Sequence, residues 1–197
     1  MITMRAANPR SGLLAALRRG WKDDRAAQIA EFAVSLPLLV VFTVGIFDFS
    51  GAFSLKQKLM NAAREAARVA ASDPATDLNN TLPVSVSDAY QVVDNYLLSE
   101  KINTCGLTVV PPSLPPAGLT WTYSSSGSGC PGTGITLTIN RGCKSTITSG
   151  SNINLIETCI TISYAYKWQF NSVMGLLGGN AAGPTSLTAK AEAFNEN

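Results

Sequence analysis

The chain has 197 residues and a net charge of +2, which is enough for one domain of ordinary size with an appendage. It contains no histidine, so the Ser-His-Asp and Cys-His arrangements and the His-Glu-x-x-His metalloprotease motif are excluded. It also lacks the Gly-x-x-x-x-Gly-Lys-Ser/Thr loop that binds nucleotide phosphates. We therefore expect no enzymatic activity, no bound metal and no cofactor.

Positive charge is concentrated at the N-terminus. Residues 1–25 carry six basic and two acidic side chains, whereas the rest of the chain has a net charge of −2. A basic N-terminus can bind nucleic acid, or it can stay in the cytoplasm ahead of a membrane segment under the positive-inside rule. Because a long apolar stretch follows directly, we favour a cytoplasmic leader over residues 1–25 and expect no nucleic-acid partner.

An apolar stretch follows the leader. From Ala26 to Phe53 the only charged side chains are Glu31 and Asp48. About 20 apolar residues, each rising about 1.5 Å, cross the hydrocarbon core of a bilayer. The stretch from Phe32 onward is long enough to do so. Pro37 removes one backbone hydrogen bond and should kink or loosen the helix locally.

The helical pattern continues beyond the apolar stretch. The run L-K-Q-K-L-M-N-A-A-R-E-A-A-R-V-A-A-S is rich in strong helix formers and ends before Pro74. Glu65 and Arg68 can form an ion pair at i,i+3 on a polar face that also carries Arg64. One helix from about Asp24 to Ser72 would be roughly 70 Å long. Its apolar stripe is formed by residues three and four apart, namely Leu55, Leu59, Ala62, Ala63, Ala66 and Ala70.

The remaining chain predicts a polar linker at 73–85 and a small α+β domain at 86–197. Ser87 is a plausible N-cap for a helix whose apolar face holds Ala89, Val92, Val93, Tyr96 and Leu97. Asp88 and Asp94 on that helix do not share a face and are expected to be solvated. Alternation of apolar and hydroxyl residues predicts strands at L-T-V-V (107–110), L-T-W-T-Y (119–123), I-T-L-T-I (135–139) and C-I-T-I-S-Y-A-Y (159–166).

Three further C-terminal segments are less regular. The glycine-rich segment 127–134 is predicted to be a loop between strands. The segment 168–179 is apolar but too short to span a membrane, and its glycines predict an irregular packed loop. The segment 186–194 permits a final strand or, because of its alanines, a helix.

All four cysteines follow the apolar stretch. An even number confined to the exported part indicates two disulfides in an oxidising compartment, with free buried thiols as the alternative. Three pairings are possible, and the sequence does not choose among them. The candidates are Cys105, Cys130, Cys143 and Cys159.

The N-terminal segment has three possible interpretations. A cleaved secretory signal would end at the small residues S-G-A before Phe53, but the apolar run is too long and the helix continues without interruption. An ordinary single-pass anchor explains the length but gives no role to Glu31 or to the alanine-rich extension.

The third interpretation is a pilin-like subunit. The strings A-A-Q-I-A-E-F-A-V-S-L-P-L-L, G-I-F-D-F and L-M-N-A-A-R-E-A-A-R-V-A-A occur in order between residues 26 and 71. With these strings the chain resembles the TadE-like family of minor pseudopilins, which belong to the tight-adherence pilus machinery of bacteria. The resemblance covers about residues 25–72.

The resemblance implies processing by a prepilin peptidase. The glutamate of such proteins is fifth in the mature chain, so cleavage would fall between Ala26 and Ala27. Ala26 departs from the glycine that usually precedes the cut. The new ammonium group on Ala27 would lie about one helical turn from Glu31, which can neutralise it within the same chain or in a neighbouring subunit.

We therefore expect a single-pass inner-membrane protein with a cytoplasmic N-terminus, a helix over 26–72 and a periplasmic or extracellular domain. Its expected role is that of a minor pilin-like structural or assembly component. The alternative is a membrane-anchored binding or adhesion domain without a filament role. Expected partners are the lipid bilayer, other pilin or pseudopilin subunits, the prepilin peptidase and the pilus assembly platform. Candidate helix-packing residues are Phe32, Leu36, Leu39, Phe42, Phe47, Leu59, Arg64 and Arg68.

Overall fold

The computed structural model describes residues 24–109, 111–112, 118–149, 151–171, 175 and 183–196. The chain divides into two compact units, Met1–Phe47 and Asp48–Asn197, and each is described separately. The predicted cytoplasmic leader lies almost entirely outside the described residues, as does most of the apolar segment 168–179.

Helix α2 extends from Asp24 to Ser72, which confirms the single long helix predicted from the sequence. It continues through Pro37. The hydroxyl of Ser35 donates to the Phe32 carbonyl at 3.2 Å, and that of Thr43 donates to the Leu39 carbonyl at 2.8 Å. These polar side chains are thus satisfied within the helix, as an apolar surrounding requires.

The N-terminal part of α2 is exposed along its length. Every described side chain from Ala27 to Val40 is exposed, although most of them are apolar. Among the described residues, α2 is the one helix long and apolar enough to cross a membrane. A helix with no buried apolar stripe has no protein core to join, and lipid is the solvent that suits it. The length and composition of α2 therefore suit a single pass through a membrane.

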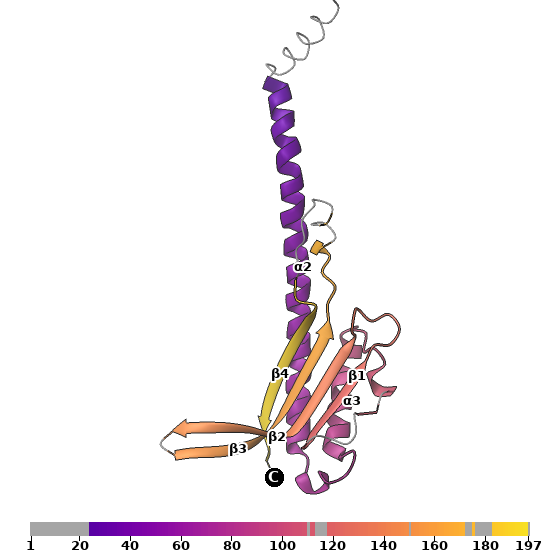
Figure 1. The fold of residues 1–197 in the computed structure, drawn as a ribbon, viewed down its shortest axis with the longest axis vertical. Helices are drawn as coiled ribbons and strands as arrows, with labels where there is room; N and C mark the ends of the chain where they lie inside the picture. The colour runs from indigo at the N-terminus through magenta and orange to yellow at the C-terminus, as the bar shows by residue number, and fades with distance from the viewer. Residues whose placement is uncertain are drawn as a thin grey trace, which may run out of the picture. The chain divides into compact units, whose positions relative to one another are not determined.

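The second unit is built on a four-stranded antiparallel sheet (Figure 1). Its strands are β1 (Thr120–Ser125), β2 (Ile135–Ser149), β3 (Ser151–Ala165) and β4 (Ser186–Phe194), in the order β1-β2-β3-β4. The predicted α+β class is confirmed, and the ambiguous C-terminal segment is a strand. Beyond Asn140, β2 pairs only with β3, because β1 ends its pairing there.

One face of the sheet carries the core. Across the strands, Trp121 lies opposite Ile139, Ile139 opposite Ile160, and Ile160 opposite Ala191. All are buried together with residues of α3 (Val84–Ser99) and of the second half of α2. Figure 1 shows both helices on the same side of the sheet. The other face is lined by hydroxyl side chains such as those of Thr122, Thr138, Thr161, Ser124 and Thr136, which are not buried.

The alanine face of α2 is part of this core. The predicted stripe is confirmed, since Leu59, Ala62, Ala63, Ala66 and Ala70 are all fully buried and Leu55 is partly buried. The methyl groups of this helix face belong to the same buried cluster as the large side chains of the sheet.

Three local predictions were wrong. Residues 107–109 form a 3₁₀ turn rather than a strand, because Cys105 and Gly106 have positive φ angles of 60° and 75° that turn the chain. Helix α3 begins at Val84, and Pro83 rather than Ser87 is its N-cap. Asp94 is buried rather than solvated, because the buried face of α3 is wider than its apolar stripe.

Candidate functional site

The acidic residue at the end of the apolar stretch is held by the C-terminal domain. Asp48 is only 6% exposed. The Tyr166 hydroxyl donates to Asp48 Oδ1 at 2.9 Å, and the Phe170 backbone N–H donates to Asp48 Oδ2 at 2.9 Å. Each carboxylate oxygen therefore accepts a hydrogen bond from a segment more than 100 residues away. Hydrogen bonds to a charged acceptor are about twice as strong as neutral ones.

Tyr166 is positioned by the chain that follows β3. Its backbone N–H donates to the Thr185 carbonyl at 3.0 Å, and its ring meets that of Trp168 edge-on with centroids 4.9 Å apart. Trp168 is itself fixed by donation from Nε1 to the Pro184 carbonyl at 2.6 Å. A Cβ atom at Gly51 would lie 3.3 Å from the Tyr166 hydroxyl, so a small residue one turn after Asp48 leaves room for the phenol.

The environment of Tyr166 favours its neutral, donating form. Burial, the hydrogen bond to Asp48 and the negative charge of Asp48 together raise the pKa of Tyr166 to about 12. At neutral pH the hydroxyl therefore keeps its proton and continues to donate.

A buried arginine holds the other end of α2. Arg141 is 1% exposed, and its Nη2 donates to the Asp73 carbonyl at 3.0 Å. Nη1 donates to the Ala70 carbonyl and, at 2.9 Å, to the Thr158 hydroxyl. The last carbonyls of a helix lack intrahelical donors and carry partial negative charge. The guanidinium group therefore supplies both hydrogen-bond donors and positive charge at the C-terminal end of α2.

A bulge in β2 places this arginine. The register between β2 and β3 shifts between Asn140 and Cys143, where the Gly142 N–H donates to the Asn140 side chain at 2.8 Å. The disulfide between Cys143 and Cys159 joins the two strands beside the bulge. Bulges commonly redirect a side chain. Arg141 lies within this bulge, and its side chain is buried on the helix side of the sheet.

Between these two ends α2 is also tied to α3. Lys58 and Glu100 form an ion pair at 3.0 Å, although both side chains are about one-third exposed and the pair adds little stability. Segment 48–72 of α2 is thus fixed at Asp48 by the chain after β3, along its alanine face by the core, and at its end by Arg141. The geometry is that of a structural joint between a helix and a domain.

The comparison with known families bears directly on this helix. Residues 26–68 match the family model of TadE-like protein. The N-terminal helix carries a TadE-like sequence. The match covers most of the long N-terminal helix, which is also the candidate membrane span. No curated protein and no solved structure matches the chain.

The residues predicted to be functional in the TadE-like segment differ in their exposure. Leu59 is fully buried in the chain's own core, so its contacts are internal. Arg64, Glu65 and Arg68 are exposed, and the predicted Glu65–Arg68 ion pair has a separation of 3.7 Å. Ala27 and Glu31 are exposed on α2. The other candidates are exposed apolar side chains, namely Phe32, Leu36, Leu39, Phe42 and Phe47.

The four cysteines form two disulfides, which selects one of the three possible pairings. Cys105 pairs with Cys130 and Cys143 with Cys159, with Cα–Cα distances of 5.6 and 5.9 Å. The first pair joins the turn after α3 to the predicted glycine-rich loop, which is confirmed as a loop between β1 and β2. The second joins neighbouring strands.

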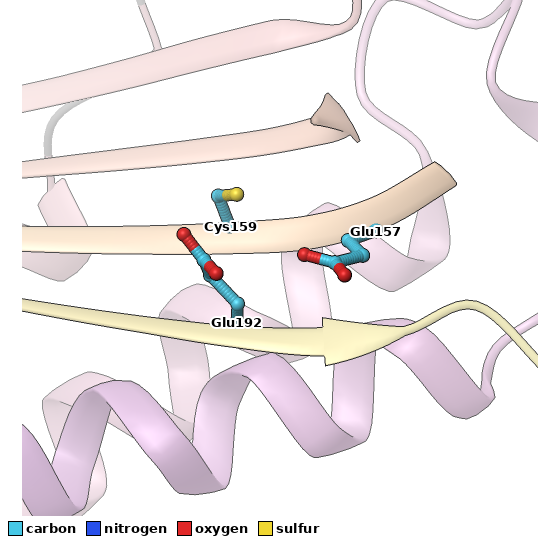
Figure 2. A group of neighbouring side chains, drawn as sticks. All are labelled: Glu157, Cys159 and Glu192. Carbon is cyan, nitrogen blue, oxygen red and sulfur yellow. The ribbon is translucent and has the colours of Figure 1, made fainter. Parts of the chain in front are cut away.

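One cluster on the sheet has the composition of a metal site. Figure 2 shows Glu157 and Cys159 on β3 and Glu192 on β4, with the Glu192 carboxylate directed toward Cys159. The sulfur of Cys159 is part of a disulfide, and Glu192 pairs with Lys190 at 2.6 Å. Glu157 accepts a hydrogen bond from the Ser145 hydroxyl. Because each group already has a partner, these residues do not suit a metal ion.

Asp48 and Arg141 are the residues of this joint that the sequence prediction missed. Asp48 had a signal, since a carboxylate in an apolar stretch requires a polar partner. Arg141 also had one, because the alternation of I-T-L-T-I-N-R continues Ile135, Leu137 and Ile139 onto the same face.

Proposed function

We propose that this protein is a minor pilin-like structural or assembly component of a tight-adherence pilus system. Its N-terminus lies in the cytoplasm, α2 crosses the bacterial inner membrane, and the domain over 86–197 lies on the periplasmic or extracellular side. The basic leader supports this orientation through the positive-inside rule, and the disulfides support an oxidising compartment.

The observation that carries the proposal is the position of the TadE-like match. The matched residues include the exposed apolar part of α2 and the part that is clamped to the sheet. Segment 48–72 of α2 is fixed to the domain at Asp48 and Arg141. A subunit that leaves the membrane for an assembly needs this coupling, since the domain must follow the helix.

Glu31 has a defined role in this proposal. If the prepilin peptidase cuts between Ala26 and Ala27, the new ammonium group lies four residues from Glu31, about 6 Å along the helix axis. The Glu31 carboxylate then neutralises that amine, in its own chain or in a neighbouring subunit. Pairing of the two charges reduces the cost of placing either one among packed helices in lipid.

The N-terminus of the membrane-extracted protein tests the processing step. Intact mass measurement is expected to find a chain that begins at Ala27. A chain that begins at Met1 would remove the processing step and support a plain anchor, and one that begins at Phe53 would indicate a secreted protein.

Deletion of the gene tests the pilus role against adhesion alone. The proposal predicts loss of surface pili, counted by electron microscopy, with recovery when the wild-type chain is supplied in trans. Normal pili with reduced attachment to a surface would instead favour a membrane-anchored adhesion domain.

A further inference from the structure

The apolar stripe of α2 continues past Asp48 into the second unit. Phe42, Ile46, Phe49 and Phe53 recur at spacings of four, three and four residues, so they form one stripe. All four are exposed, Phe49 by 66% and Phe53 by 56%. Asp48 and Ala52 lie on another face of the same turns, and both are buried. Over these turns α2 has one face covered by its own domain and another face that is bare and apolar.

Helix length places Asp48 within the apolar layer. Seventeen rises separate Glu31 from Asp48, about 26 Å, which is shorter than the hydrocarbon core of about 30 Å. Twenty-one rises separate Phe32 from Phe53, about 32 Å, which matches it. With Glu31 at one membrane edge, Asp48 lies a few ångströms inside the other edge, and helix tilt would move it deeper. An uncovered carboxylate at that depth would be costly.

The domain covers this carboxylate with aromatic residues. The Tyr166 hydroxyl donates to Oδ1 of Asp48, and the Phe170 backbone N–H donates to Oδ2. The Trp168 ring packs against that of Tyr166. Lys167, between Tyr166 and Trp168 in the sequence, is exposed. Tyr and Trp concentrate at membrane interfaces, where an apolar ring and a polar group are both satisfied, and lysine reaches the headgroups from the same depth.

We propose that the end of the domain formed by Tyr166, Lys167, Trp168, Phe170, Phe49 and Phe53 lies in the headgroup region of the bilayer. Its partner is the lipid surface itself. The aromatic residues hold the domain at a fixed depth and shield Asp48 from the acyl chains. The inference rests on the membrane anchoring of the proposed function and adds to it the site at which the domain contacts lipid.

Spin labels on the full chain in phosphatidylcholine–phosphatidylglycerol vesicles test this placement. Single cysteines replace Lys167, Thr188 and Phe42, all exposed positions, and the native disulfides are kept oxidised. Lys167→Cys should be more accessible to oxygen than to a water-soluble nickel chelate, as Phe42→Cys should be. Thr188→Cys on β4 should show the reverse. Equal nickel accessibility at positions 167 and 188 would overturn the inference and leave the anchoring intact. If Phe42→Cys were also accessible to the nickel chelate, both the inference and the membrane anchoring would be contradicted.

Quenching by brominated lipids gives a second measurement without a label. Trp168→Phe is expected to remove a lipid-quenchable part of the tryptophan emission, because Trp168 lies at the interface. Trp121 is fully buried in the core and remains unquenched in both proteins. An unchanged quenchable fraction in Trp168→Phe would contradict the inference.

Discussion

The Tyr166 hydroxyl donates to the carboxylate of Asp48, 118 residues earlier in the chain, at 2.9 Å. Asp48 lies near the end of the apolar part of α2, and Tyr166 directly follows β3. This hydrogen bond therefore joins the TadE-like helix to the end of the sheet. Together with the hydrogen bonds of Arg141 at the C-terminal end of the same helix, it makes segment 48–72 of α2 an integral part of the domain.

Removal of the Tyr166 hydroxyl should weaken the joint. Tyr166→Phe deletes one hydrogen bond to a charged acceptor and is expected to cost about 1–2 kcal/mol in the free energy of unfolding. That cost corresponds to a fall in Tm of roughly 2–8 °C for a chain of this size. Circular dichroism of the detergent-solubilised protein measures it. Tyr96→Phe on α3 is the control, because the Tyr96 hydroxyl makes no hydrogen bond within the described residues, and an equal loss there would contradict the assignment.

High pH should weaken the same contact. Burial and the Asp48 carboxylate raise the pKa of Tyr166 from its usual value of 10.0 to about 12. The contribution of the Tyr166 proton to stability is therefore fully present below about pH 10 and is lost as the pH rises to 12. The difference in Tm between wild type and Tyr166→Phe is therefore expected to shrink between pH 9 and pH 12. A difference that stays constant across that range would show that the Tyr166 proton does not contribute.

Substitution of Arg141 should be more damaging. Arg141→Met removes the guanidinium donor from the buried Ala70 carbonyl, and an unsatisfied buried group costs about 1–3 kcal/mol. Arg141→Lys keeps the charge but lacks the fork that reaches several acceptors, so it is expected to fall between Met and wild type. Chemical denaturation gives the order. Lys144→Met, an exposed lysine on the same strand, should have almost no effect.

All four cysteines should be disulfide-bonded in the membrane-extracted protein. Alkylation without reduction is expected to label none of them, and reduction first is expected to label all four. The two bonds close loops of 25 and 16 residues, so serine substitution of either pair is expected to cost about 3 kcal/mol. Alkylation before reduction would contradict an oxidised domain.

The sequence predicted the parts of the fold that depend on periodicity. The long helix, its alanine stripe and the strands over 119–123, 135–139 and 159–166 all follow from residue spacing. The 3₁₀ turn at Leu107–Val109 could not be predicted this way, because its L-T-V-V sequence favours a strand. The positive φ angles of Cys105 and Gly106 and the disulfide to Cys130 decide the conformation there.

The contacts of the joint depend on tertiary structure. Sequence shows that Asp48 and Arg141 are unusual in their surroundings, but their partners lie far along the chain. Tyr166 is 118 residues from Asp48, and Ala70 is 71 residues from Arg141. Asp94 also depends on tertiary structure. Its place outside the apolar stripe of α3 predicts a solvated side chain, but Asp94 is buried because the buried face of α3 is wider than that stripe.

The pilus role proposed for this chain is tested most directly by counting surface pili on cells that express Glu31→Gln in place of the wild-type chain. The substitution removes the negative charge proposed to neutralise the Ala27 amine and keeps the size of the side chain. We predict normal amounts of membrane protein with few or no pili, while Glu65→Gln, at an exposed position on the same helix, leaves pili unchanged. Normal piliation in the Glu31→Gln strain would contradict the account.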